Sequence, residues 1–229
     1  MMSDVLHKIK RYWIKLRLQP IRVFCMHHVC AAFDAESMHE GDWMNIETFK
    51  IKVTNLQKIG VEFISLSEAY HHICDDWWRC KKYAVLTFDD GYSSLKEILP
   101  WLEEQKIPAT LSINGKYLDG KSYRHNPKEK YLTKDELWGL TSPLIEIGHH
   151  GWEHIRVFEM TDAEFEKSVE RNAVVISNHH NYVPFWAYTY GAHTKKTDDY
   201  LQGKHIVPVY IDGKKNYNDV KVIHRELLQ

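Results

Sequence analysis

The stretch "YAVLTFDDGY" (residues 83–92) joins a short apolar run to two adjacent acids and a glycine. The run 83–88 predicts a buried strand, because β-branched and aromatic residues favour strands. Adjacent carboxylates repel each other, so Asp89 and Asp90 are costly to keep together at the end of that strand. A divalent cation would relieve this repulsion by neutralising one carboxylate, and the other carboxylate would then be available for a different role. The rest of the chain must then supply further ligands.

Strand-like and helical segments alternate on both sides of this stretch. Further strands are predicted at 21–26, 61–66, 108–114, 144–150, 183–190, 206–211 and 220–227. Helices are predicted at 45–60, 65–77, 92–106, 133–140 and 161–180, and Pro100 is a candidate to kink or break the third of them. Capping boxes mark two helix starts, Thr133 with Glu136 and Thr161 with Glu164. Such alternation predicts parallel strands with right-handed crossovers. The fold class is therefore α/β, a distorted (β/α) barrel of about seven parallel strands, with its chemistry at the strand ends.

Composition limits the function classes. The chain has 229 residues, 30 basic and 31 acidic, with a formal net charge of −1, so no general basic surface for nucleic acid is expected. The four cysteines form no C-x-x-C pair, which disfavours zinc-knuckle and thioredoxin sites and favours buried thiols. We expect one catalytic domain over residues 20–229, preceded by a separate segment 1–19.

Segment 1–19 has an amphipathic pattern. Apolar residues recur there at helical spacing, with lysine and arginine between them: Val5, Ile9, Tyr12, Trp13 and Leu16. A basic amphipathic helix can lie on an anionic membrane surface, or it can pack on the domain with a solvated basic face. The chain shows no signal-peptide pattern and no long apolar span. We therefore expect a cytoplasmic protein that could contact the inner membrane face peripherally.

Histidines follow another predicted strand, in "EIGHHGWEHIRV" (146–157). His150 and His154 are spaced i, i+4, so one helical turn would place both imidazoles on one face. Two imidazoles and one carboxylate leave a position for water, which is the composition of a catalytic zinc site. We assign Asp90, His150 and His154 to the metal and Asp89 to the general base. Spacing alone leaves open solvated acids and ordinary hydrogen-bonded histidines.

At these residues the chain resembles the polysaccharide deacetylases, the NodB-homology or carbohydrate esterase family 4 group. "LTFDDGY" is similar to the family's first motif and "IGHHGWEH" to its second, which implies the base and metal roles given above. "WAYTYG" (186–191) is similar to a third motif, whose tyrosine amide helps to bind the oxyanion, so this role would fall to Tyr190. "FCMHHV" (24–29) resembles an early strand that ends in Y-H-x-V in one branch of the family. Met26 takes the place of the tyrosine, and His27 takes the place of the histidine and is assigned to substrate or oxyanion binding.

The chain also departs from the family pattern. Gly151 stands where serine or threonine is usual, Thr189 where proline is usual, and Ala187 where many members carry an arginine that orients the base. Arg225 is a candidate to supply that contact. The family's last motif offers a histidine as general acid, which would be His224; one branch ends instead in a proline–arginine element, which would match Arg225.

Other residues near the motifs have two interpretations each. Trp152 lies between the ligand histidines in sequence and could line an acetyl pocket or pack in the protein interior. His149 could be an additional metal ligand or a residue that only lines the site. The pairs at 71–72 and 179–180 lie in helical patterns and are predicted to be surface residues.

The resemblance implies a metal-dependent deacetylase that removes an N-acetyl group from an amino sugar. The substrate would be a saccharide or a lipid-linked saccharide precursor. Zinc is the default ion, and cobalt or nickel could substitute. The alternatives are hydrolysis of an O-acetyl ester or a non-sugar amide, and a catalytically silent saccharide-binding protein with the same fold.

Overall fold

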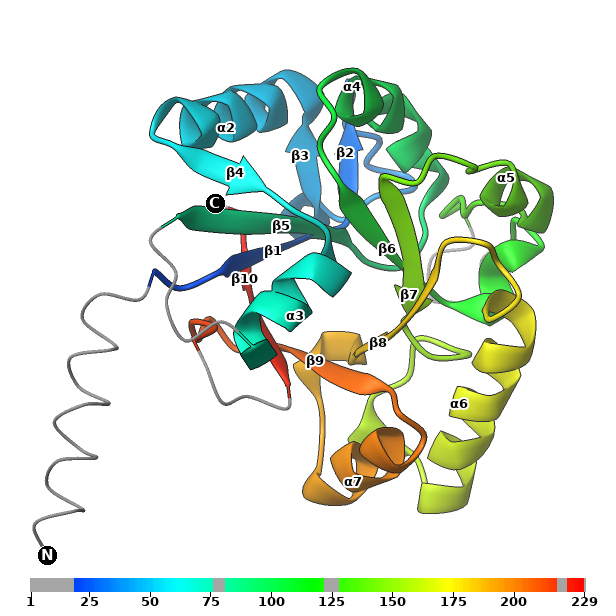
Figure 1. The fold of residues 1–229 in the computed structure, drawn as a ribbon. Coiled ribbons are helices and arrows are strands. Elements are labelled where there is room, and N and C mark those ends of the chain that lie inside the picture. Colours follow the sequence, from blue (N-terminus) through cyan, green and yellow to red (C-terminus); the bar gives the residue numbers. More distant parts are fainter. Residues whose placement is uncertain (1–18, 76–80, 122–127, 218–221, 229) are drawn as a thin grey trace, which may run out of the picture.

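A computed structural model describes residues 19–75, 81–121, 128–217 and 222–228. Seven parallel strands form a closed barrel in the order β1-β5-β6-β7-β8-β9-β10, with β10 pairing back to β1. They are β1 (Arg22–Met26), β5 (Lys82–Phe88), β6 (Ala109–Ile113), β7 (Ile145–His149), β8 (Tyr182–Ala187), β9 (Val207–Ile211) and β10 (Ile223–Leu227). The predicted barrel is confirmed (Figure 1).

Shorter elements complete the fold. Strand β4 (Val61–Phe63) pairs with the first half of β5, and β2 (His28–Cys30) pairs with β3 (Trp43–Asn45) in a separate small sheet. The helices are α2 (Ile46–Lys58), α3 (Leu66–Asp75), α4 (Leu99–Glu104), α5 (Lys134–Trp138), α6 (Asp162–Ile176) and α7 (Lys195–Gly203). Short 3-10 turns are η1 (Glu40–Asp42), η2 (Ser93–Glu97), η3 (Gly115–Leu118), η4 (Val157–Glu159) and η5 (Thr189–Gly191). None of the described helices is long and apolar enough to span a membrane.

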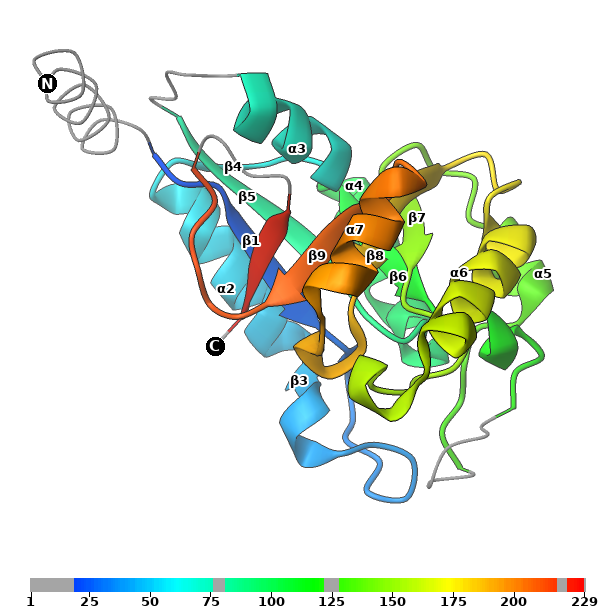
Figure 2. The ribbon, with the colours of Figure 1, turned by 90° about the horizontal axis from the view of Figure 1, so that it is seen from below.

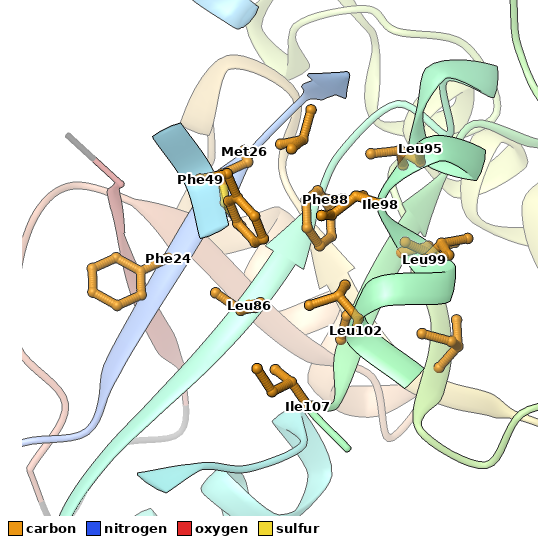
Figure 3. Close-up of a cluster of buried hydrophobic side chains, with 14 of the residues drawn as sticks. Phe24, Met26, Phe49, Leu86, Phe88, Leu95, Ile98, Leu99, Leu102 and Ile107 are labelled. Atoms are coloured by element: carbon orange, nitrogen blue, oxygen red, sulfur yellow. The ribbon is translucent and has the colours of Figure 1, made fainter. Parts of the chain in front are cut away.

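Side chains alternate between the two faces of the barrel wall. Phe24, Leu86 and Phe88 belong to a cluster that also contains residues of α2 and α4 (Figure 3). Val23 and Val85 belong to a different cluster, shared with α3 and with β8, β9 and β10, which fills the barrel interior. Because successive side chains of a strand point to opposite faces, odd-numbered positions of β1 and β5 face inward. By the same alternation, the side chain of Asp89, directly after Phe88, is expected to face the barrel interior.

Helix α3 closes the end of the barrel at which the strands begin. Its Leu66 packs among the interior residues of the barrel, and the backbone N–H of Leu66 donates to Oε2 of Glu146 at 3.0 Å. The same oxygen accepts a hydrogen bond from Thr110 Oγ1 at 2.9 Å, so the buried carboxylate of β7 is satisfied. Figure 2 shows α3 and β3 at opposite ends of the barrel. A functional site is therefore expected at the other end of the barrel, where the strands finish.

The structure corrects three details. The region 92–106 is broken, as Pro100 suggested, but the break comes before the proline: η2 is followed by α4, and Pro100 lies in the first turn of α4, where no backbone donor is needed. The strand predicted at 61–66 ends at Phe63, because α3 begins at Leu66. His179 is buried and its Nε2–H donates to Leu137 O at 3.0 Å, so its surface assignment was wrong. The prediction for residues 1–18 lies outside the described residues.

Candidate metal centre

The turn after β5 brings two neighbouring acids to one side. Asp90 and Gly91 both have left-handed backbone conformations, with φ of 72° and 76°. In a regular strand Asp90 would point away from Asp89, and the left-handed turn removes that alternation. The left-handed conformation of Gly91 favours glycine, and a Cβ there would also lie 2.9 Å from Cδ1 of Ile113, so that side chain would have to shift. This is why the motif reads Asp-Asp-Gly.

Asp90 lies between two imidazoles. Its Oδ1 is 3.3 Å from Nε2 of His150 and 3.2 Å from Nε2 of His154. Ligands about 2.0–2.2 Å from a tetrahedral zinc ion stand roughly 3.3 Å from one another. One donor atom of each of the three residues lies within 4.8 Å of the others. The spacing therefore fits a single divalent ion.

The orientation of His150 supports the same conclusion. Its Nδ1–H donates to the carbonyl of Ala187 at 2.8 Å, which fixes the ring with Nε2 facing Asp90. His150 Nε2 is buried and has no hydrogen-bond partner among the described residues. The backbone of His150 is held by Asn114, whose Nδ2 donates to its carbonyl at 2.6 Å. An oriented, buried ring nitrogen without a hydrogen-bond partner is the condition expected of a metal ligand.

The loop that carries His154 is not the predicted helical turn. Residues 150–156 form no helix, and Gly151 has φ of 89°, so His154 reaches Asp90 from an irregular loop. Ser168 Oγ of α6 accepts from Trp152 N at 2.9 Å and supplies a hydroxyl beside Gly151, where the family has one. Thr189 Oγ1 donates to Ile155 O at 2.6 Å, so this threonine ties the loop to η5.

Asp89 is held by Arg225. Arg225 Nη1 donates to Oδ1 at 2.7 Å and Nη2 to Oδ2 at 2.8 Å, and both side chains are buried. Nη1 also donates to Thr87 Oγ1 at 3.0 Å. Burial acts to raise the pKa of the Asp89 carboxyl, but the charges of Arg225 and His150 and the Arg225 hydrogen bonds together hold the pKa below its usual range. The contact that Ala187 cannot make is thus made by Arg225.

Cys25 is a further contact of Asp89. Its thiol donates to Asp89 Oδ2 at 3.4 Å, from the inward face of β1. Burial is the main cause that raises the pKa of this thiol well above its usual value. The thiol is therefore protonated at neutral pH and acts as a donor.

His27 follows β1 at the same rim. One donor atom of His27 lies within 4.8 Å of donor atoms of Cys25 and Asp89, and its Nδ1 is 3.9 Å from Asp42 Oδ1. Its charge contributes to lowering the pKa of both Asp89 and Asp90. His27 is therefore close to the reacting groups without belonging to the triad of Asp90.

His224 lies on the other face of β10 from Arg225. Its Nδ1 is 3.0 Å from both carboxylate oxygens of Asp212, and its ring meets Tyr210 edge-on at 5.7 Å. Tyr210 belongs to the cluster under α6 and α7, outside the barrel. Strand alternation explains this placement, since only one of the two neighbours can face Asp89. The described contacts bring Arg225 to the site and do not bring His224 there.

Tyr190 flanks the ligands. Its ring meets that of His154 edge-on at 4.5 Å, the Arg156 guanidinium lies 4.2 Å from its centroid, and 54% of the residue is exposed. Its φ of 55° is left-handed, a strained conformation that often occurs at functional sites. Trp152 lies beside Gly115 and lines a pocket between its loop and α6.

His149 points away from the metal ligands. Its Nδ1 accepts from Asn172 Nδ2 at 3.0 Å and its Nε2–H donates to Tyr182 OH at 2.9 Å. Burial lowers the pKa of His149 to about 3, so the ring is neutral. With both nitrogens engaged, His149 acts as a wall and not as a spare ligand.

Sequence reasoning missed Cys25, Thr87 and Asn114. Asn114 had a visible signal, because it is a polar residue directly after an apolar strand, like Asp89 and His150. Cys25 and Thr87 had no such signal, since they lie within strands and only the register of β1 against β5 pairs them.

Solved structures share this fold. IcaB from Ammonifex degensii matches with a TM-score of 0.79 and 20% identity over 92% of both chains. Deacetylase PplD of Streptococcus pyogenes, in complex with acetate, matches with 0.73 and 16% over 92% of this chain and 93% of its own. A de-N-acetylase from Aggregatibacter actinomycetemcomitans matches with 0.70 and 18% over 92% and 95%. At these identities the likeness establishes the fold.

No curated protein sequence matches the chain. The family described as Polysaccharide deacetylase matches residues 79–206, more than half of the chain. The matched range includes the acids after β5, the histidines after β7 and the turn after β8. The chain belongs to the polysaccharide deacetylase family.

Proposed function

We propose that the protein is a metal-dependent hydrolase that removes the N-acetyl group of an amino sugar. The observation that carries the proposal is the position of Asp89 beside the triad: its Oδ2 is 4.0 Å from His150 Nε2, while Asp90 takes the two imidazoles. A saccharide-binding protein needs no base beside a metal. The same arrangement suits the family to which the chain belongs.

Asp90, His150 and His154 would hold the ion. When bound, a divalent ion of this kind supplies Lewis acidity, lowering the pKa of a water and polarising the acyl carbonyl. Zinc fits the donor set of two imidazoles and one carboxylate, and cobalt or nickel could replace it. Three protein ligands leave a position open for the reaction.

Asp89 is the general base. Arg225 keeps it ionised at neutral pH and holds both of its oxygens in fixed directions, so Oδ2 is ready to accept a proton from the attacking water. Asp89 Oδ2 also accepts the weak thiol donor of Cys25 at 3.4 Å, which the proton of the attacking water would displace. Arg225 is thus a positioning residue for Asp89.

Residues at the rim of the barrel, where the strands end, take the remaining catalytic and substrate-binding roles. We assign the backbone amide of Tyr190, in its left-handed turn beside His154, to the developing oxyanion. We assign His27 to protonation of the departing amine, because it is the imidazole near Asp89 that the metal triad does not use. Trp152 would contact the sugar from its loop.

The substrate class follows from the family. The solved relatives include a de-N-acetylase and a deacetylase in complex with acetate. We propose an N-acetylated saccharide, or a lipid-linked saccharide precursor, as the substrate.

Acetate release from N-acetylated saccharides, with and without chelator, tests the proposal. Asp89→Asn should keep one bound ion per chain and lower turnover about a hundredfold or more. His150→Ala should lose the ion and the activity together. Wild-type protein that binds no divalent ion after supplementation would instead support a silent binding protein.

A further inference from the structure

A second group of metal-ligand side chains lies next to the triad of Asp90. Cys25, His27 and Asp89 each place one donor atom within 4.8 Å of the other two. Cys25 and His27 are two residues apart at the end of β1, so strand alternation puts both on the inward side. The backbone N–H of Asp89 donates to Met26 O at 2.9 Å, which fixes this acid opposite them. Two strand ends therefore present three different ligand types to one point.

The donor set differs from that of the first centre. A thiolate, an imidazole and a carboxylate suit zinc and softer ions, whereas the first centre has no sulfur. Thiol, imidazole and carboxyl all come from ordered strand ends. Cys25 and Asp89 are buried, and the half-buried side chain of His27, 22% exposed, opens the group to solvent. An ion can therefore reach the group from the rim.

Charge makes this second group the weaker one. Arg225 already contacts both oxygens of Asp89, so a second cation must approach a buried guanidinium. The Cys25 thiol must also lose the proton that it donates to Asp89. Against this, each oxygen of Asp89 keeps one lone pair for a metal, because a carboxylate can accept about four hydrogen bonds or metal contacts in total. The second group should therefore bind an ion more weakly than the first centre, so that in the wild type the first centre fills first.

We propose that Cys25, His27 and Asp89 form a second, low-affinity zinc site that switches the enzyme off. On binding, the S–H bond of Cys25 breaks, its proton leaves to solvent, and a sulfur–metal bond forms. The ion occupies the lone pair of Asp89 that would accept the proton of the attacking water. The site itself does not depend on the proposed reaction, but its inhibitory effect does.

Titration of the purified chain with cobalt(II) tests the site without any substrate. A thiolate-to-cobalt charge-transfer band should be absent up to one equivalent and grow with the second. Cys25→Ser should abolish the band, since a serine hydroxyl keeps the donor to Asp89 but is a poor ligand. His150→Ala, which removes the first centre, should keep it, and so should Cys74→Ser, which removes an exposed thiol.

A zinc titration of acetate release tests the effect. The wild type should be activated by the first equivalent and inhibited more than tenfold by excess zinc. In Cys25→Ser, the zinc concentration for half-inhibition, measured relative to the variant's own maximal rate, should rise by at least about tenfold, as expected for a lost ligand contact. A failed deacetylase assay leaves the cobalt result standing, so the two proposals fail separately.

Two results would overturn the second site: no charge-transfer band in the wild type with two equivalents, or a band of equal intensity in Cys25→Ser. If Cys25→Ser does not fold, His27→Asn serves in its place, because this side chain is half-buried. An undiminished band in folded His27→Asn would equally exclude the proposed ligand set.

Discussion

Arg225→Met is the sharpest test of the buried pair that holds the base. The substitution keeps an apolar side chain of similar reach and removes the guanidinium, which leaves the Asp89 carboxylate, 3% exposed, without its two contacts at 2.7 and 2.8 Å. Removing one partner of a buried ion pair costs about 3–5 kcal/mol, because the other charge stays buried. We expect the free energy of unfolding to fall by this amount.

Arg22→Met is the matched control. Arg22 contacts Glu226 at 2.7 Å, the same distance as in the buried pair, but the two side chains are 45% and 32% exposed. Exposed pairs contribute about 0–1 kcal/mol, so this variant should be nearly as stable as the wild type. The two variants therefore differ in burial and not in the length of the contact.

Urea unfolding followed by tryptophan fluorescence, at pH 7 with chelator present, measures both values. In an Asp89→Asn background, Arg225→Met should cost little or restore stability, because the stranded charges are removed together. The activity of Arg225→Met should also fall. The acidic side of its pH–activity profile should shift to higher pH, because the pKa of Asp89 rises without the arginine. A loss of stability no larger than that of Arg22→Met would refute the reasoning.

Three further predictions use other parts of the fold. Gly91→Ala should destabilise the chain by about 1–3 kcal/mol and weaken metal binding, because Gly91 has φ of 76° and the new Cβ would contact Ile113. Gly213→Ala is the control, since Gly213 has φ of 68° but open space around it, and this variant should keep its metal. Equilibrium dialysis measures metal binding in both variants. Thr161→Ala should lower the free energy of unfolding by about 1 kcal/mol through the lost cap of α6 and leave acetate release unchanged. Burial keeps the ring of His149 neutral and lowers its pKa to about 3 in the folded state. Below about pH 6.5, the ordinary pKa of histidine, the unfolded state therefore binds a proton at His149 that the folded state does not. His149 thus contributes stability that is present above pH 6.5 and lost as the pH falls towards 3, by up to about 1.4 kcal/mol per pH unit. His149→Gln should flatten this slope in urea unfolding curves taken between pH 4 and 7, and an unchanged slope would contradict the assignment.

Much of the fold was predictable because its causes are local. Strand runs, helix caps and the Asp-Asp-Gly turn depend on neighbouring residues, so the closed barrel and both capping boxes appeared as expected. The convergence of Asp90 with His150 and His154 also followed, since parallel strands of a barrel end at the same rim.

The long-range pairs were harder to predict. Asp89 and Arg225 are 136 residues apart, and the choice between His224 and Arg225 depends on which face of β10 turns inward. The segment around β10 gives no clear alternation to decide this. The loop from His150 to His154 has helical spacing without a helix, because its conformation is set by contacts with Ser168 and η5 and not by its own sequence.

The closure of the barrel by α3 determines how a substrate can approach. Leu66 and its neighbours fill the far end of the barrel, so the metal centre at the opposite rim cannot be reached through the barrel. On the proposed function, a saccharide would therefore have to approach from the rim where the strands end and present one N-acetyl group at a time to the site. N-acetyl groups in the middle of such a saccharide would then be as accessible as those at its ends, and acetate would leave on the side where the sugar is bound.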